Sequence, residues 1–184
     1  MKEDEEEKPE GVAEKALRKI GVKKGQRVLD FGCGSGDHTI PAARVVGKEG
    51  RVYALDKDKD ALDGLIQRAE SLGLKNIRRI DTSGDTEIGL DDESVDVILL
   101  YDVLHSYYFP QADDRRRLLD EICRVSKPDT LISVCPTHME TEKLKEEIEH
   151  ANFYLESEYS GMFVVHGNIE EGQLLNFKKG KLDK

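Results

Sequence analysis

Apolar positions along the chain alternate between short unbroken runs and patterns with helical spacing. The short runs predict five strands, at 28–31, 51–55, 77–80, 95–101 and 130–135. The spaced patterns predict helices before, between and after them, at 9–20, 37–46, 60–72, 113–125 and 141–151. Strands that alternate with helices form a parallel sheet with right-handed crossovers. The run at 95–101 (VDVILLY) is typical of a central strand of such a sheet, buried on both faces.

The end of the chain breaks this alternation. Its pattern predicts two strands, at 153–159 and 173–178, with no helix between them. A helix-free connection implies that one of these strands runs antiparallel to the rest. The predicted fold class is therefore α/β, with a Rossmann-like seven-stranded mixed sheet, the last strand antiparallel, and helices on both faces of the sheet.

Charge is concentrated at the start of the chain. The 184 residues predict one domain with a substantial core, and the net charge of −10 disfavours a nucleic-acid partner. Residues 1–10 (MKEDEEEKPE) hold six acidic and two basic side chains. We expect them to form a disordered acidic tail, or alternatively a flap over the substrate mouth. Residues 11–184 are expected to form the single domain.

Composition also limits the location of the protein and the kinds of site it holds. The first residues are charged rather than apolar, so no signal peptide is expected, and no run is long enough to span a membrane. The three cysteines, Cys33, Cys123 and Cys135, match no zinc spacing. We therefore expect a reduced, cytoplasmic protein with no metal site and no membrane insertion.

The first predicted strand ends in three glycines. Residues 28–36 are Val-Leu-Asp-Phe-Gly-Cys-Gly-Ser-Gly, and a predicted helix follows. Glycine permits a positive φ in a sharp turn and lets a ligand approach the backbone, and the start of the helix offers free N–H groups. The dinucleotide-binding spacing is G-x-G-x-x-G, which is one residue longer. The shorter loop, preceded by Asp30, suits a ligand with an amino-acid tail and no phosphate.

This nine-residue run resembles motif I of the class I S-adenosylmethionine-dependent methyltransferases. The resemblance covers roughly residues 10–178 and includes the mixed ending of the sheet. It implies S-adenosylmethionine as cofactor and a cofactor site that includes Asp30, Gly32, Cys33, Gly34, Ser35 and Gly36. The alternative is a glycine-rich turn that binds no ligand.

Two further positions are expected to hold the nucleoside. Asp56 lies 20 residues after Gly36 at the end of the second strand, where a carboxylate can accept hydrogen bonds from ribose hydroxyls, and Lys57 follows it. The alternative is a helix cap, because Asp58 and Asp60 share this turn. For the adenine contact, the resemblance implies the Gly-Asp pair at 84–85.

Asp81 is the second candidate for the adenine contact, since it lies directly at the end of the third strand. We therefore expect Asp85 first and Asp81 second.

The fourth predicted strand leads into the residues that would face a methyl acceptor. Tyr101, at its end, is expected beside the cofactor, and the following D-V-L-H resembles the small-molecule branch of the family, including the ubiquinone and menaquinone biosynthesis methyltransferases. The Asn/Asp-Pro-Pro-aromatic signature of enzymes that methylate amides and exocyclic amines is absent. His105 is a candidate general base or, equally, a structural histidine.

The same region holds two more candidates. Tyr108 is expected to wall the pocket or to make a cation–π contact, and His138 follows the fifth strand near the same edge. The run 115–117 (Arg-Arg-Arg) is expected on the solvated surface, or alternatively as an anchor for an anionic substrate.

The sequence thus predicts in-line methyl transfer from S-adenosylmethionine to a small-molecule acceptor. Two alternatives remain open: a NAD-dependent oxidoreductase, and a cofactor-binding regulatory module without turnover. The sequence leaves both a monomer and a homodimer open.

Overall fold

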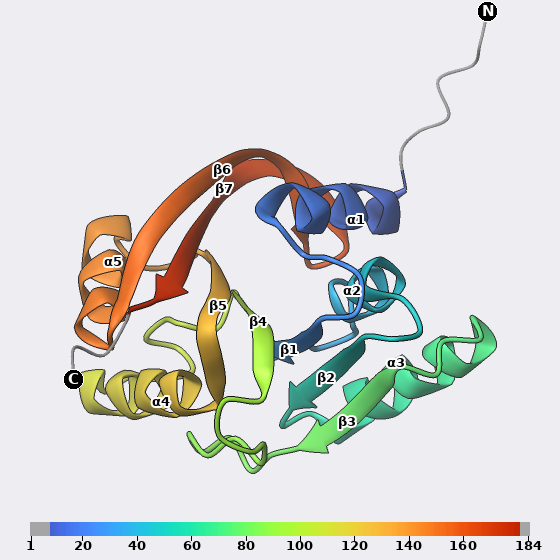
Figure 1. The fold of residues 1–184 in the computed structure, drawn as a ribbon, viewed down its shortest axis with the longest axis horizontal. Helices are drawn as coiled ribbons and strands as arrows, with labels where there is room; N and C mark the ends of the chain where they lie inside the picture. The colour runs from blue at the N-terminus through green and yellow to red at the C-terminus, as the bar shows by residue number, and fades with distance from the viewer. Residues whose placement is uncertain (1–7, 181–184) are drawn as a thin grey trace, which may run out of the picture.

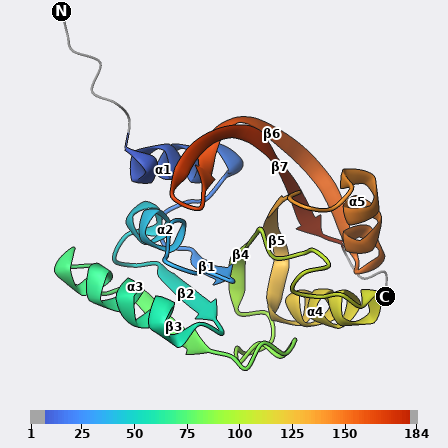
Figure 2. The same ribbon diagram turned by 180° about the vertical axis from the view of Figure 1, so that it is seen from behind.

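The computed structural model describes residues 8–180, which form a seven-stranded sheet with five helices (Figures 1 and 2). The strands lie in the order β3-β2-β1-β4-β5-β7-β6. In chain order the elements are α1 (Pro9–Ile20), β1 (Arg27–Phe31), α2 (Thr39–Val46), β2 (Arg51–Asp56), α3 (Lys59–Ser71), β3 (Ile77–Asp81), β4 (Val95–Tyr101), α4 (Ala112–Val125), β5 (Ser126–Cys135), α5 (Thr141–His150), β6 (Phe153–Val165) and β7 (Asn168–Lys179).

The sheet has the mixed topology that the alternation and its break predict. β1 pairs in parallel with β2 and β4, and the parallel pairing continues to β3 and β5 at the two sides. β7 then runs antiparallel to both β5 and β6. The predicted fold class is therefore confirmed, and the carboxyl ends of five parallel strands meet at one edge, where open α/β sheets bind ligands.

Successive side chains along the strands lie on opposite faces of the sheet. Leu29, Ile98 and Leu100 are buried with α4 and α5, whereas Val28 and Val97 are buried with α1 and α2. A third cluster joins α2 and α3 over Ala54 of β2. This alternation follows from the two-residue period of a strand, and it explains why the central strands are apolar at almost every position.

β6 and β7 are longer than the sequence patterns predict. They contain 13 and 12 residues and form a hairpin that extends beyond the sheet and arches toward α1 (Figure 1). Near the tip, Val164 packs against Val12 and Ala13 of α1. The outer part of the hairpin lacks the continuous apolar pattern of the inner strands, because much of it is exposed on one side.

The boundaries at the start of the chain differ slightly from the expected ones. The expected acidic tail spans residues 1–10, of which residues 1–7 lie outside the described residues. Pro9 and Glu10 belong to α1, since proline suits the first turn of a helix and Glu10 forms an ion pair with Arg44 of α2 at 2.7 Å. Helix α2 begins at Thr39, two residues later than predicted, because residues 37 and 38 continue the turn that follows Gly36.

One arginine of the 115–117 run is buried rather than solvated. Arg115 is only 4% exposed, and its guanidinium donates to both carboxylate oxygens of Glu147 in α5, at 2.7 and 2.8 Å, and to the carbonyl of Phe109 at 2.7 Å. Arg115 lies four residues before Leu119 and seven before Ile122, so it continues the apolar stripe of α4. The surface prediction is wrong for this residue because the helix directs it inward.

The glycine-rich loop after β1 rests on a buried carboxylate. Asp30 is 3% exposed and accepts a hydrogen bond of 2.6 Å from the hydroxyl of Thr39, the first residue of α2. Burial has the largest effect on the pKa of Asp30 and raises it, the Thr39 hydrogen bond lowers it, and nearby Asp56 and Asp37 raise it, so that together they bring the pKa from 3.8 to about 7. The Asp30–Thr39 contact thus joins the strand end to the helix start on either side of the loop.

We expect Arg115→Met to lower the free energy of unfolding by about 3 kcal/mol or more, because it leaves the Glu147 carboxylate without its partner in a partly buried site. Arg117→Met, on the exposed side of the same helix turn, is the matched control and should change stability by less than about 0.5 kcal/mol. Urea unfolding of both variants measures the difference. Equal stabilities would contradict the buried role of Arg115.

Titration of Asp30 predicts a pH dependence of stability. The folded state keeps this proton up to about pH 7 while the unfolded chain loses it near the ordinary value of 3.8. Folded molecules therefore bind more protons across this window, and the free energy of unfolding falls as pH rises. Between pH 5 and 8, wild type should lose about 2 to 3 kcal/mol relative to Asp30→Asn, which cannot ionise. A difference between the two proteins that stays constant over this range would refute the assignment.

Candidate functional site

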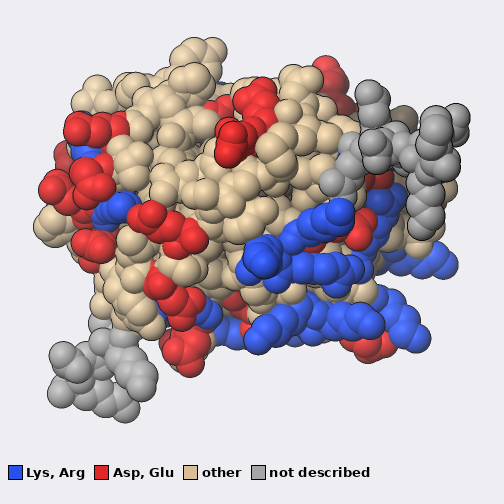
Figure 3. Space-filling model, turned by 90° about the horizontal axis from the view of Figure 1, so that it is seen from above, with Lys and Arg blue, Asp and Glu red and all other residues tan. Residues whose placement is uncertain are grey.

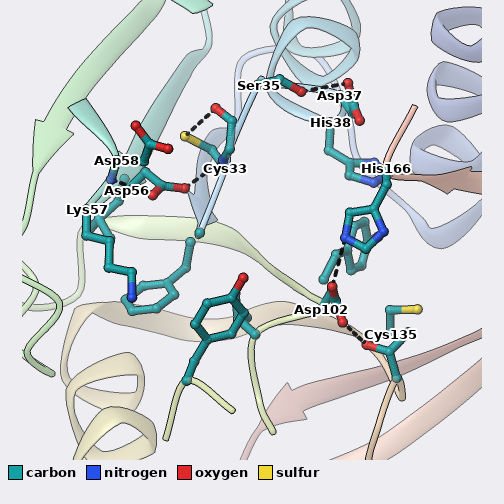
Figure 4. Close-up of a pocket in the computed structure, with 18 of the residues that line it drawn as sticks. Cys33, Ser35, Asp37, His38, Asp56, Lys57, Asp58, Asp102, Cys135 and His166 are labelled. Atoms are coloured by element: carbon teal, nitrogen blue, oxygen red, sulfur yellow. Dashed lines mark hydrogen bonds and ion pairs between the residues drawn. The ribbon is translucent and has the colours of Figure 1, made fainter. Parts of the chain in front are cut away.

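A cavity of about 580 Å³ opens at the carboxyl ends of β1, β2 and β4. Figure 4 shows Asp56, Lys57 and Asp58 on one side of it, and Asp102, Cys135 and His166 on the other. The cavity is lined by residues from the strand ends, the following loops and the β6–β7 tip: 31–35, 37–38, 55–58, 82, 84–85, 101–103, 108–109, 135, 137 and 163–167.

The three positions 32, 34 and 36 of the loop hold glycine for different structural reasons. All three have positive φ, at +74°, +49° and +86° for Gly32, Gly34 and Gly36. A Cβ at Gly32 would lie 2.3 Å from Val103, and one at Gly36 would lie 2.2 Å from Leu65, so packing within the protein requires glycine there. A Cβ at Gly34 would meet no protein atom within 4 Å. Gly34 therefore leaves open space at the wall of the cavity, as a ligand that approaches the backbone requires.

Asp56 is oriented by two backbone amides. Its carboxylate accepts a hydrogen bond of 2.7 Å from the amide of Gly34 and one of 2.9 Å from the amide of Asp58. Each carboxylate oxygen retains a further lone pair for a ligand hydroxyl. The helix-cap role that Asp56 might have had belongs to Asp58, whose side chain accepts from the amides of Asp60 and Ala61 at the start of α3.

The structure separates the two candidates for the adenine contact. Asp85 lines the cavity, in the loop after β3, and accepts hydrogen bonds from the hydroxyls of Ser83 and Thr82, the former at 2.5 Å. Asp81 is not among the lining residues, and both its oxygens accept from Arg79, at 2.7 and 2.8 Å. That pairing lowers the pKa of Asp81. Of the two, only Asp85 lines the cavity.

Lys57 closes this side of the cavity. Its ammonium lies 5.2 Å from the centre of the Tyr108 ring, within cation–π range. The cation–π partner of Tyr108 in this structure is therefore Lys57 of the protein itself. Burial raises the pKa of the Tyr108 hydroxyl.

The remaining loop candidates divide between the cavity wall and the core. Cys33 and Ser35 line the cavity; Cys33 is buried, which raises the pKa of its thiol, and Ser35 donates to Asp37 at 3.1 Å. Asp30 and Gly36 are buried and are not among the lining residues.

Tyr101 lines the opposite wall. Its hydroxyl shares a hydrogen bond of 2.9 Å with Ser133, and burial raises its pKa. Its ring packs edge-on against His38, with the ring centres 4.6 Å apart.

The candidate catalytic residues surround a side chain that the sequence analysis did not single out. Asp102 has a left-handed φ of +57° directly after β4, and its Oδ1 accepts from the hydroxyl of Thr137 at 2.6 Å. The imidazole of His105 lies 3.5 Å from this carboxylate and that of His138 3.8 Å. Of the three candidates, Tyr108 lines the cavity, whereas His105 and His138 do not.

His105 and His138 have contrasting environments. His105 is 4% exposed, with Nε2 3.2 Å from the carbonyl of Asp102 and Nδ1 accepting from the amide of Tyr107. These contacts satisfy both ring nitrogens within the loop and fit the structural alternative. The side chain of His138 is 71% exposed at the rim.

The tip of the β6–β7 hairpin supplies a wall that sequence reasoning missed. Five consecutive residues, 163–167, line the cavity, and Nε2 of His166 lies 3.0 Å from Oδ2 of Asp102. His38 holds the same tip, with Nε2 3.0 Å from the carbonyl of Val164. Burial lowers the pKa of His38 to about 4, so its imidazole is neutral near pH 7. The His-Gly-Asn sequence at 166–168 signals a turn, but no local signal shows that the hairpin reaches the site.

The described residues hold no group of three or more His, Cys, Asp or Glu side chains arranged to bind a metal ion. Within residues 8–180, no helix has both the length and the apolar character that crossing a membrane requires.

Comparison with known proteins places this site in a family. The model of a methyltransferase domain matches residues 22–181. A demethylmenaquinone methyltransferase from Geobacillus stearothermophilus is 33% identical over 119 residues, which are 65% of this chain and 48% of that protein. A probable cobalt-precorrin-6B C(15)-methyltransferase from Saccharolobus solfataricus is 46% identical over 61 residues, 33% of this chain and 31% of that protein. The chain thus spans half or less of the length of these two relatives.

Solved structures share the fold. A SAM-dependent methyltransferase from Aquifex aeolicus superposes with a TM-score of 0.70 at 22% identity, covering 90% of this chain and 88% of that one. One from Methanosarcina mazei gives 0.72 at 17% identity, covering 90% and 97%. The resemblance expected from the glycine loop and from the D-V-L-H stretch is confirmed. This chain therefore belongs to the methyltransferase domain family, as a class I S-adenosylmethionine-dependent member.

Proposed function

We propose that this protein transfers a methyl group from S-adenosylmethionine to a small-molecule acceptor. The observation that carries the proposal is the open space at Gly34: it is the one glycine of the loop whose missing side chain leaves room that no protein atom fills. Gly34 also has a positive φ, +49°, but packing against other residues does not account for its missing side chain as it does at Gly32 and Gly36. The names of the relatives, which methylate demethylmenaquinone and a cobalt-precorrin, support a small-molecule acceptor.

The residues of the cavity fit this cofactor in three parts. The loop 32–36 would hold the amino-acid portion, Asp56 would accept from the ribose hydroxyls, and Asp85 would meet the adenine. Lys57 and Tyr101 would border these portions from opposite walls. When bound, S-adenosylmethionine supplies a methyl group already activated by its positively charged sulfur. The protein's own contribution is then mainly alignment of the acceptor and exclusion of water.

The acceptor side is formed by the ends of β4 and β5 and by the hairpin tip. With the nucleoside assigned to the β2–β3 side, the cavity beyond Tyr101 remains for the acceptor. His105, Tyr108 and His138 stay proposals as catalytic residues, and only Tyr108 lines the cavity.

Several expectations about the whole protein are also part of this proposal. The continuous seven-stranded sheet supports one domain over residues 11–184, and the odd number of unpaired cysteines supports a reducing, cytoplasmic location. Monomer and homodimer both fit.

Figure 3 shows Lys and Arg gathered toward the α1 side of one face and Asp and Glu toward the α5 side. The overall net charge of −10 supports the absence of a nucleic-acid partner.

Calorimetric titration with S-adenosylhomocysteine tests the proposal directly. Wild type should bind it, and Gly34→Ala should lower the affinity at least about tenfold, because the new methyl group occupies the ligand's space. Gly73→Ala is the matched control: Gly73 has a φ of +70° and equally open surroundings, but it lies at the end of α3, away from the cavity. Both variants should lose similar stability.

Two results would contradict the proposal. One is the absence of binding to wild type together with binding of NADH, which would favour the oxidoreductase alternative. The other is an affinity of Gly34→Ala equal to that of Gly73→Ala. Binding without methyl transfer to any component of a metabolite extract would instead favour the module without turnover.

A further inference from the structure

The acceptor side of the cavity carries negative charge and no lysine or arginine. Its lining consists of residues 101–102, Cys135, Thr137 and 163–167, and Asp102 is the one carboxylate among these. Asp37, a further lining carboxylate, borders the hairpin tip, where a Cβ at Gly167 would lie 4.0 Å from its Oδ2. Lys57, the cation of the cavity, lies across from it beside Tyr108 and Asp56 (Figure 4).

Asp102 is held in place by a hydroxyl and by imidazoles, none of which is a permanent cation. Thr137 donates to one of its oxygens and the imidazole of His166 lies on the other, at 2.6 and 3.0 Å. The imidazoles of His105 and His138 also lie near the carboxylate, at 3.5 and 3.8 Å, and the Asp102 side chain is only 21% exposed. Such a charge in a half-enclosed site is stabilised by a cation from outside the protein.

The backbone at Asp102 is also unusual. Its φ of +57° is a left-handed conformation that is unfavourable for residues other than glycine. This conformation places a carboxylate at the end of a central strand, where Thr137 of the β5 end and His166 of the hairpin tip both reach it. Three separate segments therefore converge on one side chain at the cavity wall.

We propose that Asp102 recognises the acceptor and that this acceptor is a cationic amine. The inference rests on the proposed methyl transfer and names the class of substrate that the acceptor side selects. An anionic acceptor would be repelled by the Asp102 carboxylate, and no lysine or arginine of the acceptor side would offset this repulsion. The aromatic ring of Phe163 and the side chain of Val165 supply apolar surface beside the charge.

An ammonium group must lose a proton before its nitrogen can attack a methyl group. With Nε2 of His166 directed at Asp102, the lone pair of the neutral imidazole is on Nδ1. The N–H bond of the bound ammonium breaks, its electron pair stays on the nitrogen, and the proton goes to Nδ1. Asp102 then stabilises the imidazolium across the 3.0 Å contact.

Benzylamine and benzoate are matched probes of this charge selection, because they share a ring and carry opposite charges. Ligand-observed NMR on the complex with S-adenosylhomocysteine should show binding of benzylamine and none of benzoate. Asp102→Asn, which keeps the size of the side chain and tolerates left-handed backbone, should weaken benzylamine at least about tenfold. Asp129→Asn is the matched control, since Asp129 also has a left-handed φ, +63°, but does not line the cavity.

The other possible outcomes of this binding experiment overturn the inference. Benzoate binding as well as benzylamine, benzylamine failing to bind, or benzylamine binding that survives Asp102→Asn would show that Asp102 does not select a cation. A loss of S-adenosylhomocysteine affinity in Asp102→Asn as large as in Gly34→Ala would show that Asp102 holds the cofactor's own ammonium group instead.

Failure of the proposed function gives a different result. In that case S-adenosylhomocysteine does not bind wild type, and the benzylamine comparison, repeated without it, still decides whether Asp102 recognises a cation.

The role of His166 has its own test. Transfer of tritiated methyl to benzylamine should fall at least about tenfold in His166→Gln while the affinity for benzylamine changes less than about threefold. Equal rates, or binding to wild type without any transfer, would overturn the assignment.

Discussion

The hydrogen bond from the Gly34 amide to Asp56 joins the two strand ends on which the site depends. β1 and β2 are neighbours in the sheet, so a loop after one and a carboxylate after the other lie at the same edge. The bond fixes the carboxylate against the backbone of the loop and leaves lone pairs for a ligand. Beneath the loop, the contact between Asp30 and Thr39 ties the same strand to α2. Displacing either contact would change the shape of the cavity rather than the fold of the sheet.

The second half of the site depends on a contact between distant parts of the chain. The hairpin of β6 and β7 arches over the sheet, packs on α1 through Val164 and brings His166 to Asp102. His38, which follows the glycine-rich loop, contacts the same tip through the carbonyl of Val164. The same short turn therefore contacts both the segment after the glycine loop and the end of β4.

The parts that sequence predicted are those in which chemistry follows from local spacing. The glycines at 32, 34 and 36 and the carboxylate at Asp56 belong to continuous strand–loop–helix segments, and the missing helix after residue 153 was enough to predict the mixed sheet. His166 was missed because its role depends on the curvature of a hairpin, which no pattern along the chain encodes. Arg115 was predicted on the surface, although its position in the helix matches the apolar stripe of α4. The three arginines were taken together as one charged run, and the one that points inward was not separated from the other two.

The central claim is that the cavity between Asp56 and Asp102 is built for S-adenosylmethionine and a separate acceptor. A crystal structure of the complex with S-adenosylhomocysteine tests it most directly. We expect ribose hydroxyls within hydrogen-bond distance of Asp56, the adenine beside Asp85, and the sulfur facing free space next to Asp102. A ligand bound elsewhere, or one whose own ammonium group occupies the Asp102 carboxylate and fills the acceptor side, would contradict it.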